Sequence, residues 1–222
     1  MKSETVIARP QAGLLATHKV LRNTYALLAM TLLFSAGCAG AAMWLNLPQP
    51  GLIVTLVGYF GLLYLTHKLS HSVYGILAVF ALTGFMGLTL GPILSFYLKA
   101  IPNGHALVMQ ALGGTGLIFA GLSAYALTTR KDFSAWGGLL MAGVLVAFLA
   151  GIGAAVFSIP ALSLAVSAMF ILLMSAMILF QTSLIIHGGE TNYILATVSL
   201  YVSIYNLFLS LLQILGVFGG ED

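Results

Sequence analysis

Charged residues are rare in this chain and lie far apart, and this feature restricts its fold more than any other. Only 6% of the residues are Asp, Glu, Lys or Arg, and 60% are hydrophobic, whereas a soluble domain carries about 25% charged residues. Such a chain cannot cover itself with a water-compatible surface, so we expect lipid to be its main solvent. The composition therefore predicts an all-α protein that crosses a membrane several times.

The charged residues also indicate how many times the chain crosses. A charge at the bilayer centre costs about 2.5–3.5 kcal/mol, so the eight Lys and Arg and the five Asp and Glu mark where the chain meets water. They leave five long charge-free intervals: residues 23–67, 69–98, 100–129, 133–189 and 191–220. A span needs about 20 apolar residues, so three intervals hold one span each and the two longest hold two each. The seven predicted spans lie near Thr24–Leu45, Leu52–His67, Val73–Leu98, Ala106–Thr128, Trp136–Phe157, Ala161–Ile186 and Ile194–Phe218.

Proline-containing turns divide the two longest intervals. The first contains the run from Asn46 to Gly51, in which Pro48 and Pro50 end helices because proline lacks a backbone donor. The second break depends only on Ser158-Ile159-Pro160. If Pro160 merely kinks one long buried element, the chain has six spans or a re-entrant segment, and the sequence leaves this alternative open.

The positive-inside rule predicts the orientation. An N-terminus in the cytoplasm puts seven of the eight Lys and Arg in cytoplasmic segments and only Lys99 outside. We therefore expect residues 1–22 to form a cytoplasmic tail, residues 23–222 to form a single transmembrane domain, and the C-terminus to be periplasmic. No small-residue cleavage pattern follows the first apolar run, so it is a permanent helix rather than a signal peptide.

Small residues at four-residue or similar spacing predict close helix packing rather than chemistry. They form three stripes: Gly84, Gly87 and Gly91; Gly116, Ala120 and Ala124; and Gly143, Ala147 and Gly151.

The last span carries a polar stripe. Its members recur at spacings of four, three, four and three, which places them on one helical face: Ser199, Ser203, Asn206, Ser210 and Gln213. Polar groups facing lipid would lack hydrogen-bond partners, so this face should point into the bundle, with Gln181 of the sixth span as a natural neighbour. Hydrogen bonding between helices is the favoured interpretation, and a polar or water-filled pathway is the other.

The remaining motifs argue against an enzyme. Ser123 has no nearby histidine in the spans to act as its base, and the zinc motif H-E-x-x-H is absent, although His67 and His71 share a helical face. The single cysteine, Cys38, excludes an internal disulfide, and no basic cluster suggests nucleic acid. We expect no cofactor and no metal. In the loop at residues 187–190, His187 and Glu190 could form a titratable pair.

Four strings resemble the Bax inhibitor family, also called the TMBIM or lifeguard family. They are THKVLRNTY at residues 17–25, GFMGLTLGPIL at 84–94, ALTTRKD at 126–132 and HGGETNYILATVSLYVSIYNLF at 187–208. The resemblance covers about residues 12–218 and is strongest to proteobacterial members. It implies six helices around a central seventh and a place in the bacterial inner membrane.

The resemblance also implies a function. Such bacterial members bind FtsH, the membrane-anchored ATP-dependent protease, restrain its action on other membrane proteins and are slowly degraded by it. The protease engages their cytoplasmic tail, which corresponds here to a stretch that contains Met1, Lys2, Arg9, His18 and Lys19. The expected function is therefore modulation of FtsH, with the lipid bilayer and FtsH as partners.

A proton-sensitive calcium leak is the alternative function that the resemblance implies. Members that leak have two facing aspartates near the cytoplasmic ends of the sixth and seventh helices. The matching positions here are Gln181 and Ser203. Neither is a carboxylate, the ligand that calcium prefers, so this mechanism is disfavoured.

Overall fold

The computed structural model describes the backbone of residues 8–219 and the side chains of residues 17–219. The described part is helical and contains no β-strand. Its helices are α1 (Ala8–Trp44), α2 (Leu52–Leu69), α3 (Tyr74–Ala100), α4 (Gly104–Thr129), the short 3₁₀ helix η1 (Ser134–Trp136), α5 (Gly137–Val156), α6 (Pro160–Ile186) and α7 (Tyr193–Phe218). Within this part, seven helices are long and apolar enough to span a membrane. The prediction of an all-α polytopic membrane protein with seven spans is confirmed.

The division of the longest charge-free interval at Pro160 is also confirmed. Helix α5 ends at Val156, and α6 begins at Pro160, where proline at the first helical position loses no hydrogen bond because that N–H has no partner in a helix. Between them, Ser158 has a φ of 51°, in the left-handed region that non-glycine residues seldom adopt. A true turn separates two helices here, so the six-span and re-entrant alternatives are wrong.

Helix α1 begins well before the predicted first span. The span was expected to start near Thr24, but the helix begins at Ala8. Adding a residue to an existing helix needs no new nucleation, so a stable span extends readily into the polar residues before it. Pro10 lies in the first turn, where proline is tolerated. The domain boundary predicted at residue 22 therefore falls inside a continuous helix.

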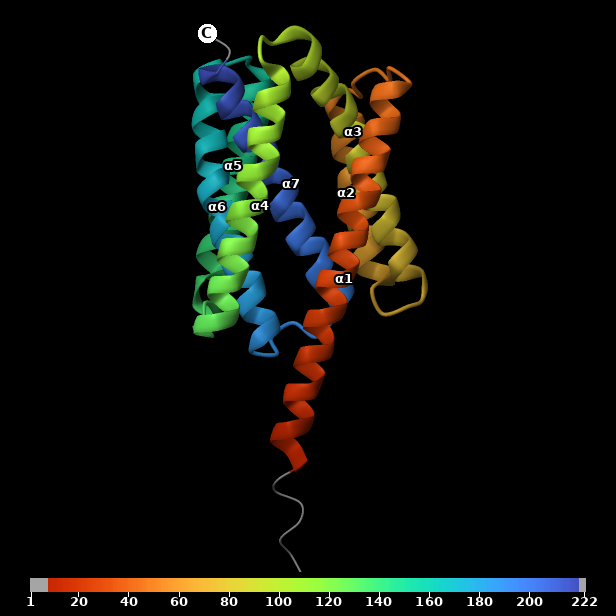
Figure 1. Ribbon diagram of the computed structural model, residues 1–222, viewed down its shortest axis with the longest axis vertical. Helices are drawn as coiled ribbons and strands as arrows, with labels where there is room; N and C mark the ends of the chain where they lie inside the picture. The colour runs from red at the N-terminus through yellow and green to blue at the C-terminus, as the bar shows by residue number, and fades with distance from the viewer. Residues whose placement is uncertain (1–7, 220–222) are drawn as a thin grey trace, which may run out of the picture.

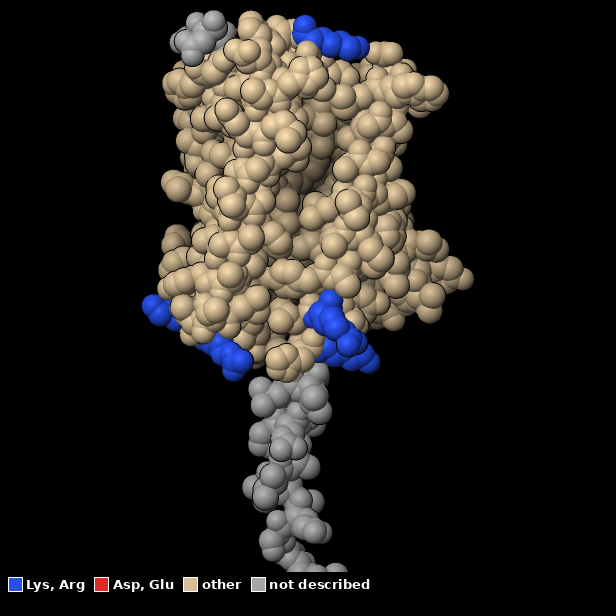
Figure 2. Space-filling view, in the orientation of Figure 1, with Lys and Arg blue, Asp and Glu red and all other residues tan. Residues whose placement is uncertain are grey.

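Successive helices run in opposite directions, so α1 enters at one end of the bundle and α7 finishes at the other (Figure 1). The order of the helices places five of the six Lys and Arg with described side chains at the end where α1 enters, which we call the basic end: Lys19, Arg22, Lys68, Arg130 and Lys131. Figure 2 shows Lys and Arg side chains at this end of the molecule. The sixth, Lys99, lies at the opposite end, where its Nζ donates to Oδ1 of Asn46 at 2.9 Å.

Helix α7 forms the interior of the bundle. It is the most buried of the seven helices, and α2 is the least buried. Helix α7 packs against α6, α4, α1 and α3, whereas α2 packs mainly against α3 and α5 mainly against α6. The buried side chains Leu200, Leu207 and Leu212 lie along its whole length. Several polar groups of α7 are therefore buried against its neighbours.

The small-residue stripes differ in what they contact. The stripe of α3 lies against α1: a Cβ on Gly87 would overlap the Ser35 carbonyl oxygen, and one on Gly91 would lie 2.8 Å from the Ala39 carbonyl oxygen. The α5 stripe contacts α6, with a Cβ on Gly143 placed 2.8 Å from a Leu173 methyl group.

The α4 stripe does not pack as predicted. Gly116, Ala120 and Ala124 are all exposed, and a Cβ on Gly116 would meet nothing within 4 Å. A small side chain suits a lipid-facing position as well as an interface, so the spacing alone could not distinguish the two.

Candidate functional site

The polar stripe of α7 faces α6, and the structure brings Ser203 and Gln181 together. The Ser203 hydroxyl donates to Oε1 of Gln181 at 3.4 Å and to the Ser199 carbonyl at 3.0 Å. Ser203 is 2% exposed and Gln181 is 7% exposed. Both groups are neutral and buried, so this pair has no proton-titratable carboxylate and offers only uncharged oxygen atoms.

The far end of the stripe makes a second polar contact with α6. The Ser167 hydroxyl donates to Oε1 of Gln213 at 2.7 Å, and Nε2 of Gln213 donates to the Ser163 hydroxyl at 2.5 Å. Between the two contacts, Ser210 is buried and Nδ2 of Asn206 donates to the Val202 carbonyl of its own helix at 2.8 Å. These contacts favour hydrogen bonding between α6 and α7 over an open pathway along the stripe.

A second polar face of α7 was not predicted. The Tyr201 hydroxyl lies 2.6 Å from the Ser35 hydroxyl of α1 and donates to the Thr83 carbonyl of α3 at 3.3 Å. One turn later, the Tyr205 hydroxyl lies 3.3 Å from the Thr89 hydroxyl. The two tyrosines, four residues apart, share one helical face, and this spacing was the signal in the sequence. They join α7 to α1 and α3, as Ser203 and Gln213 join it to α6.

Four buried hydroxyl groups form no hydrogen bond with a described residue: those of Thr24, Tyr25, Ser123 and Thr182. The Tyr25 ring packs against Phe119, one helical turn before Ser123, at a centroid distance of 6.0 Å. Ser123 has no base within hydrogen-bond reach among the described side chains, and a serine nucleophile needs one. Its environment is that of a packing residue.

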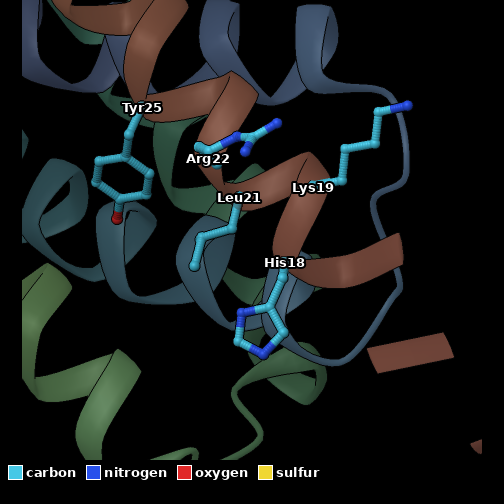
Figure 3. Close-up of a pocket in the computed structure, with 5 residues that line it drawn as sticks. All are labelled: His18, Lys19, Leu21, Arg22 and Tyr25. Atoms are coloured by element: carbon cyan, nitrogen blue, oxygen red, sulfur yellow. The ribbon is translucent and has the colours of Figure 1, made fainter. Parts of the chain in front are cut away.

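The basic end of α1 carries a hollow of about 590 Å³, lined by His18, Lys19, Leu21, Arg22 and Tyr25 (Figure 3). His18, Leu21 and Tyr25 point to one side of the helix, and Lys19 and Arg22 point away from them (Figure 3). His18 and Lys19, predicted as tail residues, thus belong to the turns of α1 that enter the bundle, and both are exposed. Met1 and Lys2 lie outside the described residues, and Arg9 lies in α1 where only the backbone is described.

His187 and Glu190 do not form the pair that their spacing suggested. The two ring nitrogens of His187 lie 2.9 Å from the Ser183 carbonyl oxygen and 3.1 Å from the Arg130 carbonyl oxygen. Oε1 of Glu190 instead accepts the Asn192 N–H at 2.7 Å. Each side chain instead contacts the backbone of a different segment.

Asn192 was missed in the sequence and organises the start of α7. Its Oδ1 caps the helix by accepting from the N–H groups of Ile194 and Leu195, and its Nδ2 donates to the Ser70 carbonyl at 3.0 Å. An Asn directly before an apolar helix is a capping signal. The loop between α2 and α3 is thereby fixed to the loop between α6 and α7.

The loop between α4 and α5 is fixed to the end of α6. The Ser183 hydroxyl accepts the Phe133 N–H at 3.0 Å and donates to the Lys131 carbonyl at 3.1 Å. Within this loop, the hydroxyl and the amide of Ser134 donate to the Asp132 carboxylate and lower its pKa, with a smaller contribution from His187. Among the described residues no three His, Cys, Asp or Glu side chains gather to hold a metal ion.

The fold and these contacts define a polytopic helical membrane protein whose central helix is held by neutral hydrogen bonds. The family model described as "Inhibitor of apoptosis-promoting Bax1" matches residues 17–220. The chain therefore belongs to the Bax inhibitor family, as its motifs predicted.

Three bacterial relatives match almost the whole chain. "Modulator of FtsH protease YccA" of Escherichia coli strain K12 is 59% identical over 212 residues, which cover 96% of this chain and 95% of the relative. A protein of a second Escherichia coli strain, with the same identity, is named "Inner membrane protein YccA". An uncharacterized protein of Pseudomonas aeruginosa is 57% identical over 203 residues and 91% of each chain. Together with the seven apolar helices, this kinship confirms the predicted location in the bacterial inner membrane.

Proposed function

We propose that this protein modulates FtsH, as an inhibitor that the protease also degrades slowly, and that it is not itself an enzyme. The observation that carries the proposal is the 59% identity to the modulator YccA over 96% of the chain. Similarity of this extent covers every helix of the bundle and both loops that fix α7. A partner surface built on these elements is therefore available in both proteins.

The course of α1 supports the proposal. The backbone of the helix extends beyond the ends of its neighbours at the basic end (Figure 1). A protease can therefore reach this end of the helix without opening the fold.

The orientation that this function needs follows from the charges. With the basic end in the cytoplasm, the projecting part of α1 lies on the side where ATP is available to an ATP-dependent protease. The C-terminus is then periplasmic. Labelling tests this directly: in a Cys38→Ser background, a membrane-impermeant maleimide should modify Asp222→Cys but not Ser3→Cys in intact cells. The reverse pattern would exclude the proposed orientation.

The function is tested by the lifetime of the protein in cells. Deleting residues 2–18 removes the projecting turns but leaves Val20 and the core of the bundle. We expect this variant to persist longer than the full chain in cells with active FtsH, and both to persist equally in cells whose FtsH lacks ATPase activity.

A matched control removes residues 220–222 at the other terminus and should leave the lifetime unchanged. Co-purification with FtsH then distinguishes binding from degradation. Equal lifetimes of the full chain and the residue 2–18 deletion in cells with active FtsH would reject the proposed role of the N-terminal segment. Failure of the full chain to co-purify with FtsH would reject the function as a whole.

A further inference from the structure

A cavity of about 410 Å³ lies among α2, α3, α5, α6 and α7. Its walls are mainly aromatic and aliphatic, and they include Phe85, Phe148, Phe170 and Met174. No charged side chain lines it. Pockets of about 300–1,000 Å³ with apolar walls and few polar groups are typical of small-molecule sites.

The cavity opens toward the lipid between α2 and α5. Phe60 of α2 and Phe148 of α5 meet there edge to face, with ring centroids 5.6 Å apart. Phe60 is 46% exposed and Leu145 is 58% exposed, and both also line the cavity. Because α2 packs mainly on α3 and α5 mainly on α6, this aromatic contact is a narrow link between two otherwise separate helix pairs. A molecule dissolved in the bilayer can enter beside it.

One edge of the cavity is polar but neutral. Asn206 lies halfway along α7, and its Nδ2 donates to the Val202 carbonyl, while its Oδ1 accepts no hydrogen bond from a described residue. Tyr59 also lines the cavity, and its hydroxyl has no hydrogen-bond partner among the described residues. The Tyr205 hydroxyl, in contrast, is occupied by Thr89. An acceptor and a donor are thus available at mid-membrane depth, where polar groups are costly and mark functional sites.

We propose that this cavity binds a membrane-dissolved amphiphile with one hydrocarbon chain and one neutral hydrogen-bonding group, a hydroxyl or a carbonyl. The apolar walls hold the chain, and Asn206 and Tyr59 hold the polar group. An ionised group is excluded because a carboxylate or phosphate would be desolvated with no positive partner in the cavity. A plain alkane fits the walls but leaves Asn206 unsatisfied.

The test uses hexadecanol with a photoreactive diazirine in its chain, bound to the full-length protein in lipid nanodiscs. Labelled peptides should come from the cavity-facing parts of α2, α5 and α7. Unlabelled hexadecanol should compete at about one fifth of the mole fraction that hexadecane needs, the factor expected from one hydrogen bond. Ionised palmitate should compete least.

Two substitutions test the contributions of the apolar walls and of the polar edge to binding separately. Val144→Phe fills the cavity and should reduce labelling to the level of peptides that face bulk lipid. Its matched control is Val146→Phe on the same helix, where the side chain is 60% exposed and lies outside the cavity; this variant should label normally. Asn206→Leu keeps the size of the side chain and should retain labelling while reducing the preference for hexadecanol over hexadecane, since Tyr59 remains.

Either variant can overturn the proposal. Labelling that is uniform over all lipid-facing helices, or that survives Val144→Phe, would show that the cavity is not the site. If Val144→Phe does not yield a monodisperse protein, Asn206→Leu decides: an unchanged preference for hexadecanol would refute the role of Asn206. None of these measurements involves FtsH, so their outcome is independent of the function proposed above.

Discussion

The hydrogen bond between Ser35 and Tyr201 gives the sharpest test of how the bundle is held. Both side chains are buried, at 5% and 1% exposure, and their hydroxyl groups are 2.6 Å apart. A buried hydrogen bond contributes about 1 kcal/mol to stability in water-soluble proteins, but such bonds between membrane helices average about 0.6 kcal/mol, since polar groups in the unfolded state in lipid also find partners.

The substitution Tyr201→Phe removes the bond to Ser35 and the longer contact with the Thr83 carbonyl at 3.3 Å. We expect it to lower the free energy of unfolding by about 1 kcal/mol. Ser35→Ala leaves the Thr83 contact in place and should cost about 0.6 kcal/mol. The double variant should then be no less stable than Tyr201→Phe alone, which gives a coupling energy of about 0.6 kcal/mol.

The assay is reversible unfolding in mixed micelles with increasing sodium dodecyl sulfate, followed by circular dichroism, for the four proteins of the cycle. Additive effects of the two substitutions would mean that Ser35 and Tyr201 act independently. That result would refute the inference that this bond joins α1 to α7.

Three further predictions follow from other contacts. Gly87→Ala should destabilise the protein by about 1–3 kcal/mol because the new methyl group overlaps a backbone carbonyl of α1. The control Gly113→Ala, whose new methyl group meets nothing within 4 Å, should be neutral or slightly stabilising in the same unfolding assay. Asn192→Ala should cost about 1 kcal/mol through loss of the α7 cap and should speed hydrogen exchange in the first turn of α7. Liposomes that contain the purified protein should pass no more calcium than empty vesicles between about pH 6 and 8, since Gln181 and Ser203 offer no carboxylate. Calcium flux above that background would support the calcium leak as a function.

The sequence predicted those features of the fold that depend on the free-energy cost of placing a charged residue or a proline within a span. Charge-free intervals gave the number of helices, and Ser158-Ile159-Pro160 marked the turn between α5 and α6 that the structure contains. The period of the polar residues on the last span indicated that Ser203 and Gln213 share one face, and both contact α6.

Features that depend on the neighbouring helices could not be predicted. Gly87 and Gly116 are the same residue type in similar stripes, yet one meets a backbone carbonyl and the other faces outward. The spacing of Tyr201 and Tyr205 showed that they share a face, but the partners of Tyr201 on α1 and α3 depend on how those helices pack and could not be predicted. The start of α1 was missed because helix extension depends on the span that follows it, not on the polar residues themselves.

The unbroken course of α1 from Ala8 to Trp44 has a mechanical consequence. A motor that pulls on the N-terminal segment loads the whole helix lengthwise, and the load passes directly to the backbone contacts at Gly87 and Gly91. These contacts must break at the same time rather than one after another. The Ser35–Tyr201 bond transmits the same force to α7. A pull on the N-terminal end of this helix is therefore expected to meet the resistance of all these contacts at once.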